Sequence, residues 1–303
     1  MIKTKKTKVF AVLVCYNPSY EIIFKTLESI IAQVEKMYVI DNSDDESKIL
    51  RKDFPLWDHE KIEFISLGKN TGIAFAQNIG IKKSIQNKAD YILLSDQDTI
   101  YPKNYVKEIL KILKNHENKE KIAAIAPDFL EMNRGGKRQG FVRFEGISLK
   151  KIFPITGCHT ITQAIASGKI ISANALEKIG FMEEKLFIDW VDLEWCWRAL
   201  AKGFFIIGCA DVVIQHTLGD TVSSVFNKNY PIRSPLRHYY IIRNAVHLSL
   251  RSKYITLRMR IHLFVKSIRN TIGFTVLGKP HLKHFRFVIL GFYHGLKGRL
   301  GKY

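Results

Sequence analysis

The sequence predicts an α/β fold in which a mostly parallel sheet is covered by helices on both faces, followed by a basic, helical C-terminal region. Two observations predict this order. Short apolar runs alternate with helical patterns over the first two thirds of the chain, and acidic residues are absent after Asp220. With 303 residues, of which 47% are hydrophobic, the chain is long and apolar enough to bury a substantial core.

Short apolar runs predict the strands, because each is bounded by polar or turn-forming residues. In chain order they are Val9–Cys15, Met37–Asp41, Ile62–Ser66, Tyr91–Ser95 and Ile122–Pro127. Helical patterns are expected over Glu21–Val34, Ile73–Gln86, Ala173–Ile179 and Asp192–Lys202. A further helix is expected to open at Pro102. Shorter elements after the fifth strand predict a less regular second half of the domain.

Cysteine spacing and hydropathy indicate a cytoplasmic protein. The four cysteines show no paired spacing, which suits a reducing compartment and argues against a disulfide framework or a zinc site. The apolar run Val9–Cys15 follows a basic N-terminus but leads directly into Asn17-Pro18. We therefore interpret it as the first buried strand rather than as a signal peptide. No stretch reaches the roughly 18 apolar residues of a spanning helix.

The charge distribution divides the chain into two predicted domains, residues 1–228 and 229–303. The net charge is +19, and positions 221–303 contain 16 Lys or Arg but no Asp or Glu. Two segments of this region, Ile255–Leu277 and Phe285–Leu296, combine helical apolar spacing with basic side chains. This pattern is typical of helices that lie on an anionic membrane surface.

The longer segment carries its apolar side chains at helical spacing, at Leu257, Ile261, Phe264, Ile268 and Ile272. Its basic side chains fall on an adjacent side, at Arg258, His262, Lys266 and Arg269. We expect peripheral attachment to the inner face of the cytoplasmic membrane. In the alternative interpretation, the helices pack on the main domain with their charges in solvent. Such a basic tail also permits nucleic-acid binding, but its apolar content argues against nucleic acid as a partner.

Asp96-Gln97-Asp98 follows the predicted strand Tyr91–Ser95, at the edge where open α/β sheets bind their ligands. Two carboxylates one residue apart on a turn suit a hard divalent cation, which in turn can bind a diphosphate. A plain solvated turn explains this pattern equally well, because Asp-x-Asp is common in turns.

Three other predicted strands end in polar clusters that converge on the same edge. Each cluster alone is explained by an ordinary turn with a helix cap. Together they predict a nucleotide site, in which Asp41 accepts a hydrogen bond from a pyrimidine N3–H and Lys69 and Asn70 approach ribose or phosphate. The candidate donor-binding residues are Tyr16, Asn17, Asp41, Asn42, Lys69, Asn70, Gly72 and Asp96.

Taken together, these motifs resemble the family 2 glycosyltransferases with the GT-A fold. The matching segments are Val12–Asn17, Ile40–Ser43, Asn70–Ala74, Asn78–Gly80, Ser95–Asp98, Phe187–Trp195 and Gln215–Asp220. The match spans about residues 8–250 and is most similar to the bacterial rhamnosyltransferase branch.

The resemblance implies an inverting, metal-dependent hexosyltransferase. It implies dTDP-β-L-rhamnose as donor, Mg²⁺ or Mn²⁺ as cofactor, and a lipid-linked oligosaccharide of cell-surface polysaccharide synthesis as acceptor. It also implies that Asp98 and His216 bind the metal and that Asp96 contacts the donor or the metal. From the residues alone, a histidine after an apolar strand is more often structural.

The resemblance further implies that Asp192 is the general base, which removes the proton of the attacking acceptor hydroxyl. Asp189 is expected either to cap the helix or to contact acceptor, and Trp190 offers a face for sugar stacking. Ser167 and Gly168 are acceptor-side candidates, with a capping turn as the alternative. Arg243, together with Arg237, is a candidate for the acceptor pyrophosphate, with a solvated basic face as the alternative. Glu194 lies four residues before Arg198, which predicts an ion pair.

Other functions remain open at this point. A glycosyltransferase of the same fold that uses galactofuranose or glucose fits the same motifs. A nucleotidyltransferase also uses carboxylates at strand ends, but its triphosphate loop usually carries more basic residues near the first strand. A basic nucleic-acid-binding protein is favoured only by the C-terminal region.

Overall fold

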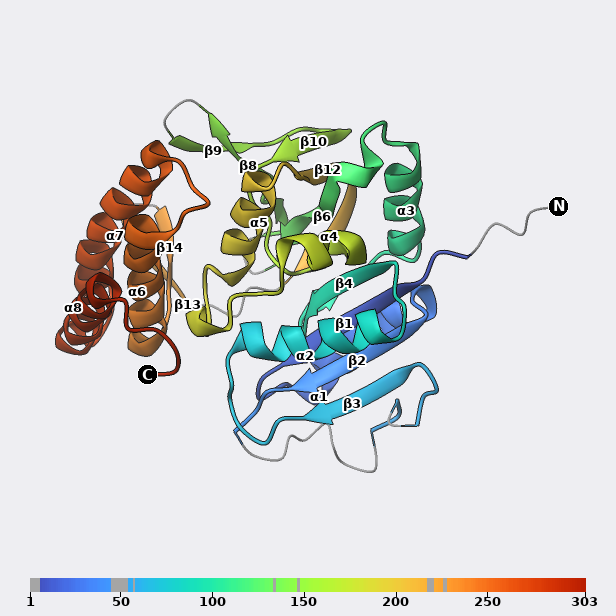
Figure 1. Ribbon diagram of the computed structural model, residues 1–303. Coiled ribbons are helices and arrows are strands. Elements are labelled where there is room, and N and C mark those ends of the chain that lie inside the picture. Colours follow the sequence, from blue (N-terminus) through green and yellow to red (C-terminus); the bar gives the residue numbers. More distant parts are fainter. Residues whose placement is uncertain are drawn as a thin grey trace.

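The computed structural model describes residues 6–44, 54–56, 58–132, 135–145, 148–216, 221–225 and 228–303 (Figure 1). The Thr217–Asp220 part of the matching segment Gln215–Asp220 lies outside these residues. The strands are β1 Val9–Cys15, β2 Lys36–Asp41, β3 Ile62–Ser66, β4 Tyr91–Asp96, β5 Thr99–Ile100, β6 Ile122–Glu131, β7 Lys137–Arg138, β8 Phe141–Glu145, β9 Ser148–Ile152, β10 Cys158–Ile161, β11 Ile170–Ser172, β12 Phe205–His216, β13 Thr221–Val225 and β14 Lys228–Ile232. The α-helices are α1 Tyr20–Ile30, α2 Ile73–Gln86, α3 Tyr105–Asn115, α4 Ala173–Ile179, α5 Val191–Ala201, α6 Pro235–Arg251, α7 Leu257–Leu277 and α8 His281–Lys297.

One mixed sheet organises the first two thirds of the chain, with the strand order β10-β12-β6-β11-β4-β1-β2-β3. Strands β4, β1, β2 and β3 are parallel to one another, and β6 is parallel to β12. Strand β11 is antiparallel to both β4 and β6 and joins the two parallel groups. The predicted α/β class with a mostly parallel sheet is therefore confirmed.

Strand β1 shows why the sheet is covered on both faces. Its side chains alternate between two hydrophobic clusters, with Val9, Ala11 and Leu13 in one and Phe10 and Val12 in the other. The first cluster includes residues of α1 and α3, and the second includes residues of α2, α4 and α5. A continuous apolar run is what a strand buried on both faces requires.

The predicted elements agree with the observed ones except near their ends. The predicted helix at Glu21–Val34 divides into α1 and a 3₁₀ turn over Ile31–Gln33. Pro102 precedes α3 rather than opening it, because residues 99–100 first form the short strand β5. Strand β6 extends four residues beyond the predicted Pro127 and pairs along most of β12.

The C-terminal residues form three helices that pack on the sheet domain. In Figure 1, α6, α7 and α8 stand together at the side of the molecule opposite α3. Helix α6 is the inner one, and its Leu248 joins the same core cluster as Met259 and Leu263 of α7. Among the described helices, none is both long and apolar enough to cross a bilayer.

Two rows of apolar side chains remain exposed on these outer helices. On α7 the row consists of Leu257, Ile261, Val265, Ile268, Ile272 and Val276. On α8 it consists of Leu282, Phe285, Ile289, Tyr293 and Leu296. We refer to these eleven residues as the exposed apolar rows. Phe264, predicted to lie in the same row, is instead partly buried against Phe292.

Candidate active site

Three candidate metal ligands come together at the carboxyl end of β4. Asp96, Asp98 and His216 each offer a ligand atom, and these atoms lie within 4.8 Å of one another. His216 Nδ1 lies 3.3 Å from Asp98 Oδ1, and its Nε2 lies 4.0 Å from Asp96 Oδ2. Two carboxylates and an imidazole are a ligand set that divalent cations accept in proteins.

The short strand β5 explains how residues so far apart in sequence meet. It pairs antiparallel with the end of β12, so that Thr99 lies opposite His216 and Asp98 is carried next to the imidazole. Burial lowers the pKa of His216, but its hydrogen bond to the Asp98 carboxylate and the charges of both aspartates outweigh this effect and raise the pKa. Partial burial raises the pKa of Asp96, and the charge of Asp98 adds to the rise.

The predicted donor-side loops are tied to one another by side-chain hydrogen bonds. Asn42 Oδ1 accepts from the backbone N–H and the hydroxyl of Thr71, and Asn70 Oδ1 accepts from the backbone N–H of Gly72. Asn42 Nδ2 also donates to Asn70 Oδ1 at 3.3 Å. Asn42 and Asn70 therefore fix the shape of the edge, and Lys69, which precedes Asn70, is exposed to solvent.

Asp41 carries a buried oxygen without a hydrogen-bond partner in the described part of the chain. Its Oδ1 accepts from the backbone N–H and hydroxyl of Ser43, whereas Oδ2 is buried and unpaired. A buried carboxylate oxygen without a hydrogen bond is costly, so an N–H or O–H group of a bound ligand would be a good partner for it. Beside it, the backbone N–H of Asn17 donates to the Ser43 hydroxyl and that of Tyr16 donates to Gln97 Oε1.

Consecutive residues connect the metal-ligand cluster to the candidate base. The Ser167 hydroxyl donates to Asp96 Oδ2, and the backbone N–H of Ala166 donates to Asp192 Oδ2 at 3.1 Å. Gly168 follows with φ +79°, and a Cβ there would lie 2.8 Å from Pro127 Cγ. The turn at Ala166–Gly168 thus requires glycine, and its consecutive residues Ala166 and Ser167 bind the two carboxylates.

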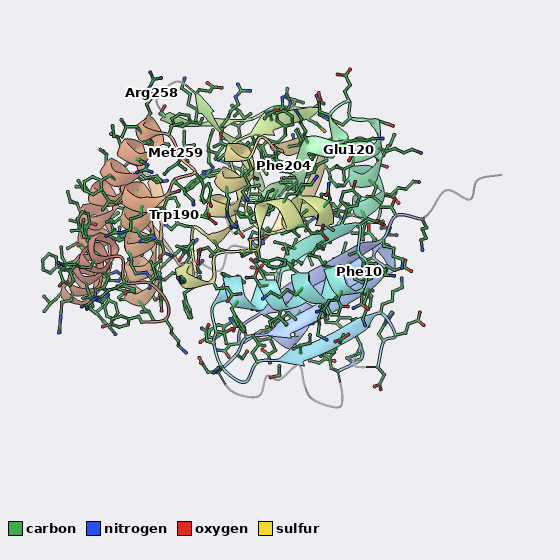
Figure 2. The ribbon with its side chains drawn as sticks, viewed as in Figure 1. Phe10, Glu120, Trp190, Phe204, Arg258 and Met259 are labelled. Carbon is green, nitrogen blue, oxygen red and sulfur yellow. The ribbon has the colours of Figure 1, made fainter. Side chains whose placement is uncertain are left out.

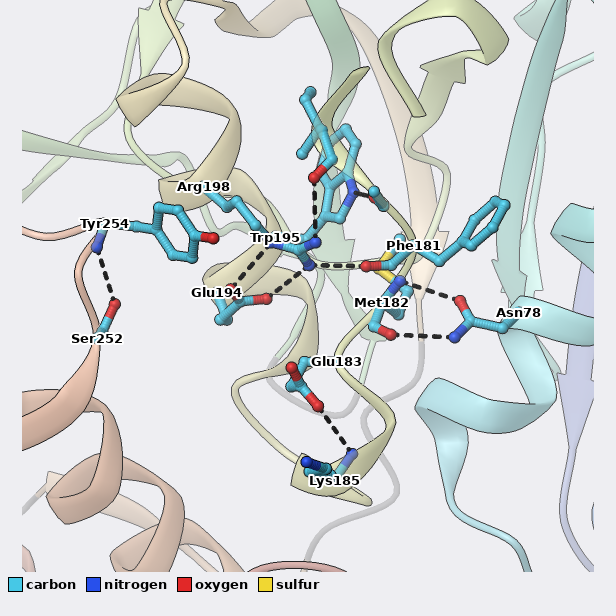
Figure 3. A network of polar contacts seen from close by, with 12 residues as sticks. Asn78, Phe181, Met182, Glu183, Lys185, Glu194, Trp195, Arg198, Ser252 and Tyr254 are labelled. Atoms are coloured by element: carbon cyan, nitrogen blue, oxygen red, sulfur yellow. Dashed lines mark hydrogen bonds and ion pairs between the residues drawn. The ribbon is translucent and has the colours of Figure 1, made fainter. Parts of the chain in front are cut away.

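Asp192 lies in the first turn of α5, which a buried ion pair anchors (Figure 3). Arg198 binds Glu194 through two hydrogen bonds and also donates to the backbone carbonyls of Ile179 and Phe181. The predicted Glu194–Arg198 pair is confirmed, at 2.9 Å. Partial burial and the charge of Asp96 raise the pKa of Asp192, while the nearby Lys169 ammonium opposes the rise.

Lys169 is a residue that sequence reasoning missed. It is fully buried, its ammonium lies 5.6 Å from the centre of the Trp195 ring, and its charge acts on Asp192. The only signal in the sequence is a lysine at the start of the apolar run that forms β11, a position that the periodicity alone would make apolar.

The loop before α5 is strained and is held from the C-terminal helices. Phe187, Asp189 and Trp190 all have positive φ, between 60° and 67°, which is rare for residues with side chains. The buried Asn244 of α6 donates to the carbonyls of Leu186, Ile188 and Asp189. Such a conformation persists only where the surroundings enforce it.

Charged side chains also hold the loop before α5 in place. Asp189 accepts from Arg233 and from Arg237 at 3.2 Å, so it is engaged within the protein. The buried Arg243 donates to the carbonyls of Leu186 and Gly301. Trp190 Nε1 donates to the carbonyl of Ile241 at 2.9 Å, at the junction of the two regions (Figure 2).

The same loop contacts the donor side of the edge. The backbone N–H of Ile73, at the start of α2, donates to the carbonyl of Phe187 at 2.8 Å. Gly72 has φ +89°, and a Cβ there would lie 2.6 Å from that carbonyl oxygen. Close approach of the two loops therefore requires glycine at position 72.

A second group of possible metal ligands, which contains two cysteines, lies on β10 and β12. Cys158 and Cys209 are paired in register, with their sulfur atoms 3.0 Å apart, and Asp211 lies close to both. Sequence spacing does not reveal this pair, because the two cysteines are 51 positions apart on antiparallel strands.

Known glycosyl transferases are similar in sequence to this chain. The model of the family described as glycosyl transferase family 2 matches residues 10–180. The dTDP-rhamnosyl transferase RfbF of Shigella flexneri is 33% identical over 302 residues, which cover 97% of each chain. The low-salt glycan biosynthesis hexosyltransferase Agl10 of Haloferax volcanii is 25% identical over 96% of this chain and 92% of that protein.

Solved structures support the fold. S. aureus TarS in complex with UDP-GlcNAc aligns over 95% of this chain and 81% of its own, with a TM-score of 0.57 and 15% identity. GalNAc-T7 with UDP, GalNAc and Mn²⁺ aligns over 91% of this chain and 58% of its own, with a TM-score of 0.57 and 14% identity. The chain therefore has the GT-A fold and belongs to glycosyl transferase family 2.

Proposed function

We propose that this enzyme transfers L-rhamnose from dTDP-β-L-rhamnose to a lipid-linked glycan, with inversion at the anomeric carbon. The observation that carries the proposal is that Asp96, Asp98 and His216 lie together, while the turn that binds Asp96 through Ser167 also binds Asp192 through Ala166. The sugar is supported by the 33% identity to a relative named as a dTDP-rhamnosyl transferase.

In this proposal the carboxyl edge of the sheet binds the donor. The unpaired Asp41 Oδ2 would accept the N3–H of thymine, and Lys69 would approach the ribose or the phosphates. Asp98 and His216, with Asp96 beside them, would hold a divalent cation, either Mg²⁺ or Mn²⁺. That cation would offset the negative charge of the departing nucleoside diphosphate.

Asp192 would act as the general base. The acceptor hydroxyl oxygen forms a bond to the anomeric carbon while the bond from that carbon to the diphosphate oxygen breaks, and Asp192 takes the hydroxyl proton. Its raised pKa supports this role, because a carboxylate of higher pKa is a better proton acceptor. Ser167, Gly168, Asp189 and Trp190 would border the acceptor, while Arg243 supports the loop that carries Asp189.

We further propose that α7 and α8 attach the enzyme to an anionic membrane surface at the inner face of the cytoplasmic membrane. Support comes from the exposed apolar rows and from the surplus of 16 basic residues without an acidic one after Asp220. Apolar side chains would enter the headgroup region while basic ones meet lipid phosphates. Contiguous apolar rows do not suit nucleic acid, whose backbone is bound mainly by charge.

A panel of nucleotide sugars tests the donor. The enzyme is incubated with Mn²⁺ and dTDP-rhamnose, UDP-galactofuranose or UDP-glucose, and donor turnover and thermal stabilisation are measured. We expect both responses to be largest with dTDP-rhamnose. Turnover of UDP-glucose or UDP-galactofuranose in preference to dTDP-rhamnose would contradict rhamnose as the transferred sugar. The enzyme would still be a hexosyltransferase, which is how the Haloferax relative is named.

A further inference from the structure

A cavity of about 830 Å³ lies between the loop before α5, the start of α6 and the inner side of α7. Asp189 and Trp190 form one of its walls. They precede the proposed base, Asp192, by three and two residues. Its volume is within the usual range for sites that bind small molecules. The donor-binding edge of the sheet contributes none of its lining residues.

Positive charge prevails in this cavity. Arg233, Lys266 and Arg269 line it, and among the described residues of its lining only Asp189 is acidic. Asp189 is shared between Arg233 and Arg237, at 3.2 Å from each. In the described part of the chain, neither Lys266 nor Arg269 has a carboxylate within 4.0 Å. An anion entering the cavity would therefore meet uncompensated positive charge.

Among these basic residues, the surroundings of Lys266 favour an anionic ligand most strongly. Its ammonium lies 5.5 Å from the centre of the Trp190 ring, whose indole N–H is bound to the carbonyl of Ile241 and holds the ring in place. Burial lowers the pKa of Lys266, and the charge of Arg269 lowers it further. A partly buried ammonium that pairs with none of the described carboxylates is costly to keep, and an anionic ligand would remove this cost.

Histidine adds no charge to the cavity near neutral pH. His238 also lines it, stacked on Phe274 and with its Nδ1 2.9 Å from Nδ1 of His284. Burial and the neighbouring His284 and arginines lower the pKa of His238 to about 3, so this imidazole is neutral. The positive charge that an anion would meet therefore comes from lysine and arginine rather than from histidine.

The rest of the wall is apolar. Leu193 and Ile241 lie near the loop before α5, and Phe274 and Leu277 lie towards the end of α7. Ile272 and Val276 of the exposed apolar rows lie on the outer side of the same helix. A ligand that fills the cavity would thus carry an anionic group beside a hydrocarbon portion, and it would lie one helix away from the surface proposed to meet the membrane.

We propose that this cavity binds the phosphate-bearing head of the acceptor lipid, with its phosphates on Lys266 and Arg269 and its first hydrocarbon units along Phe274 and Leu277. The inference rests on the proposed function and deepens it. It identifies the acceptor class as a glycan joined to a hydrocarbon chain through phosphate or diphosphate. Bound in this way, the lipid head is adjacent to Asp189, and the attached sugar extends towards Asp192.

Binding of farnesyl diphosphate, a soluble prenyl diphosphate, tests the cavity directly. Calorimetric titration is carried out in EDTA, so that no cation at Asp98 can hold the diphosphate. We expect the double variant Lys266→Gln/Arg269→Gln to bind the probe about 10-fold or more weakly, because two charge-assisted contacts are lost. Farnesol, which has the chain without the phosphates, should bind weakly to the parent and the variant alike. Equal affinity of parent and variant for farnesyl diphosphate would overturn the inference.

A charge-matched control separates the cavity from general electrostatics. Lys103→Gln/Lys107→Gln removes two exposed charges near the start of α3, on the opposite side of the molecule, and should leave probe affinity unchanged (Figure 1). Dihexanoyl phosphatidylglycerol, titrated in the same way, presents a membrane phosphate instead. If its affinity depended on Lys266 and Arg269 as strongly as that of farnesyl diphosphate, the cavity would bind ordinary phospholipid and the acceptor assignment would be wrong.

A second measurement on the same variant separates this inference from the proposed function. Mn²⁺-dependent binding of dTDP should be unchanged in Lys266→Gln/Arg269→Gln, which also reports that the variant is folded. If dTDP binds and dTDP-rhamnose is turned over while probe affinity does not change, the inference alone fails. If dTDP-rhamnose is not a donor, the proposed sugar fails, whereas the probe titration still decides what the cavity binds.

Discussion

The carboxyl edge of the sheet and the C-terminal helices build two sides of one site by different means. At the edge, backbone topology does most of the positioning. Strand β4 ends at Asp96, and β5, which begins directly after Asp98, pairs with the end of β12 at His216. The helices act through long side chains: Asn244 and Arg243 reach from α6 to the carbonyls of the strained loop before α5. We therefore expect the strand-built edge to tolerate substitutions near it. The loop held by side chains should instead depend on each of those side chains.

This contrast suggests a division of labour. The sheet edge alone contains the candidate donor and metal ligands, and the helices line the cavity proposed for the acceptor head. Changes in the helices should therefore alter acceptor use and turnover while donor binding persists. Changes at the edge should abolish donor binding itself. The following substitutions test that division, beginning with the largest expected effect.

Asp192→Asn should lower kcat by at least about 100-fold while leaving donor affinity nearly unchanged, because asparagine keeps the size of the side chain but cannot take the proton. Steady-state kinetics with dTDP titration measures both quantities. A variant that retained most of its turnover would transfer the role of base to Asp189 or Glu194. Both of those residues already form ion pairs with arginines, Asp189 with Arg233 and Glu194 with Arg198, which argues against either of them as the base.

Asn244→Leu should lower kcat about 10-fold and reduce thermal stability, again with little change in dTDP affinity. It removes the Asn244 donor from the carbonyls of Ile188 and Asp189, and one of the donors from that of Leu186, which keeps Arg243. Each buried group left unsatisfied costs about 1–3 kcal/mol. The matched control is Asn115→Leu at the exposed end of α3. Full activity of Asn244→Leu, with a melting temperature equal to that of the control, would show that the helices do not hold the loop.

Ile261→Ser/Ile272→Ser should reduce sedimentation with anionic vesicles about 10-fold without affecting dTDP binding. Both side chains are exposed in the α7 row, and their transfer into the headgroup region supplies part of the attachment energy. Ile22→Ser on α1 removes an equally apolar exposed side chain from the sheet domain and serves as control. Undiminished sedimentation, or a change from dimer to monomer instead, would indicate that the rows contact protein rather than lipid.

Lys169→Met should move the acidic limb of the pH–rate profile to higher pH, the smallest effect in this series. Burial already raises the pKa of Asp192, so activity falls with decreasing pH above the usual aspartate range of about 3.9. Removing the ammonium, which opposes that rise, should raise the pKa further. A limb that stayed in place or moved to lower pH would mean that the profile does not report Asp192.

Sequence reasoning predicted the sheet edge well and the helical side only in part. Local apolar runs determine β1 to β4, and parallel strands end at one edge, so the meeting of Asp41 with the Asp96–Asp98 turn was predictable. Apolar spacing also predicted helices over Ile255–Leu277 and Phe285–Leu296, which correspond to α7 and α8.

What sequence reasoning did not predict depends on contacts between distant segments. The Cys158–Cys209 pair depends on antiparallel register, and Lys169 reaches Asp192 only because β11 and α5 fold together. Lys266, expected on the membrane-facing side of its helix, instead covers Trp190 inside the cavity. Helical periodicity predicts which residues share a side of a helix, but it does not tell which side a neighbouring domain covers.

Metal-dependent donor binding at the sheet edge is the central claim, and titration of dTDP with and without Mn²⁺ tests it most directly. The parent protein should bind dTDP tightly only when Mn²⁺ is present. Asp98→Ala should lose that metal-dependent binding while Lys266→Gln/Arg269→Gln retains it, because one change removes a ligand of the cluster and the other lies in the helices. Metal-dependent binding of equal strength in Asp98→Ala and the parent would contradict the account.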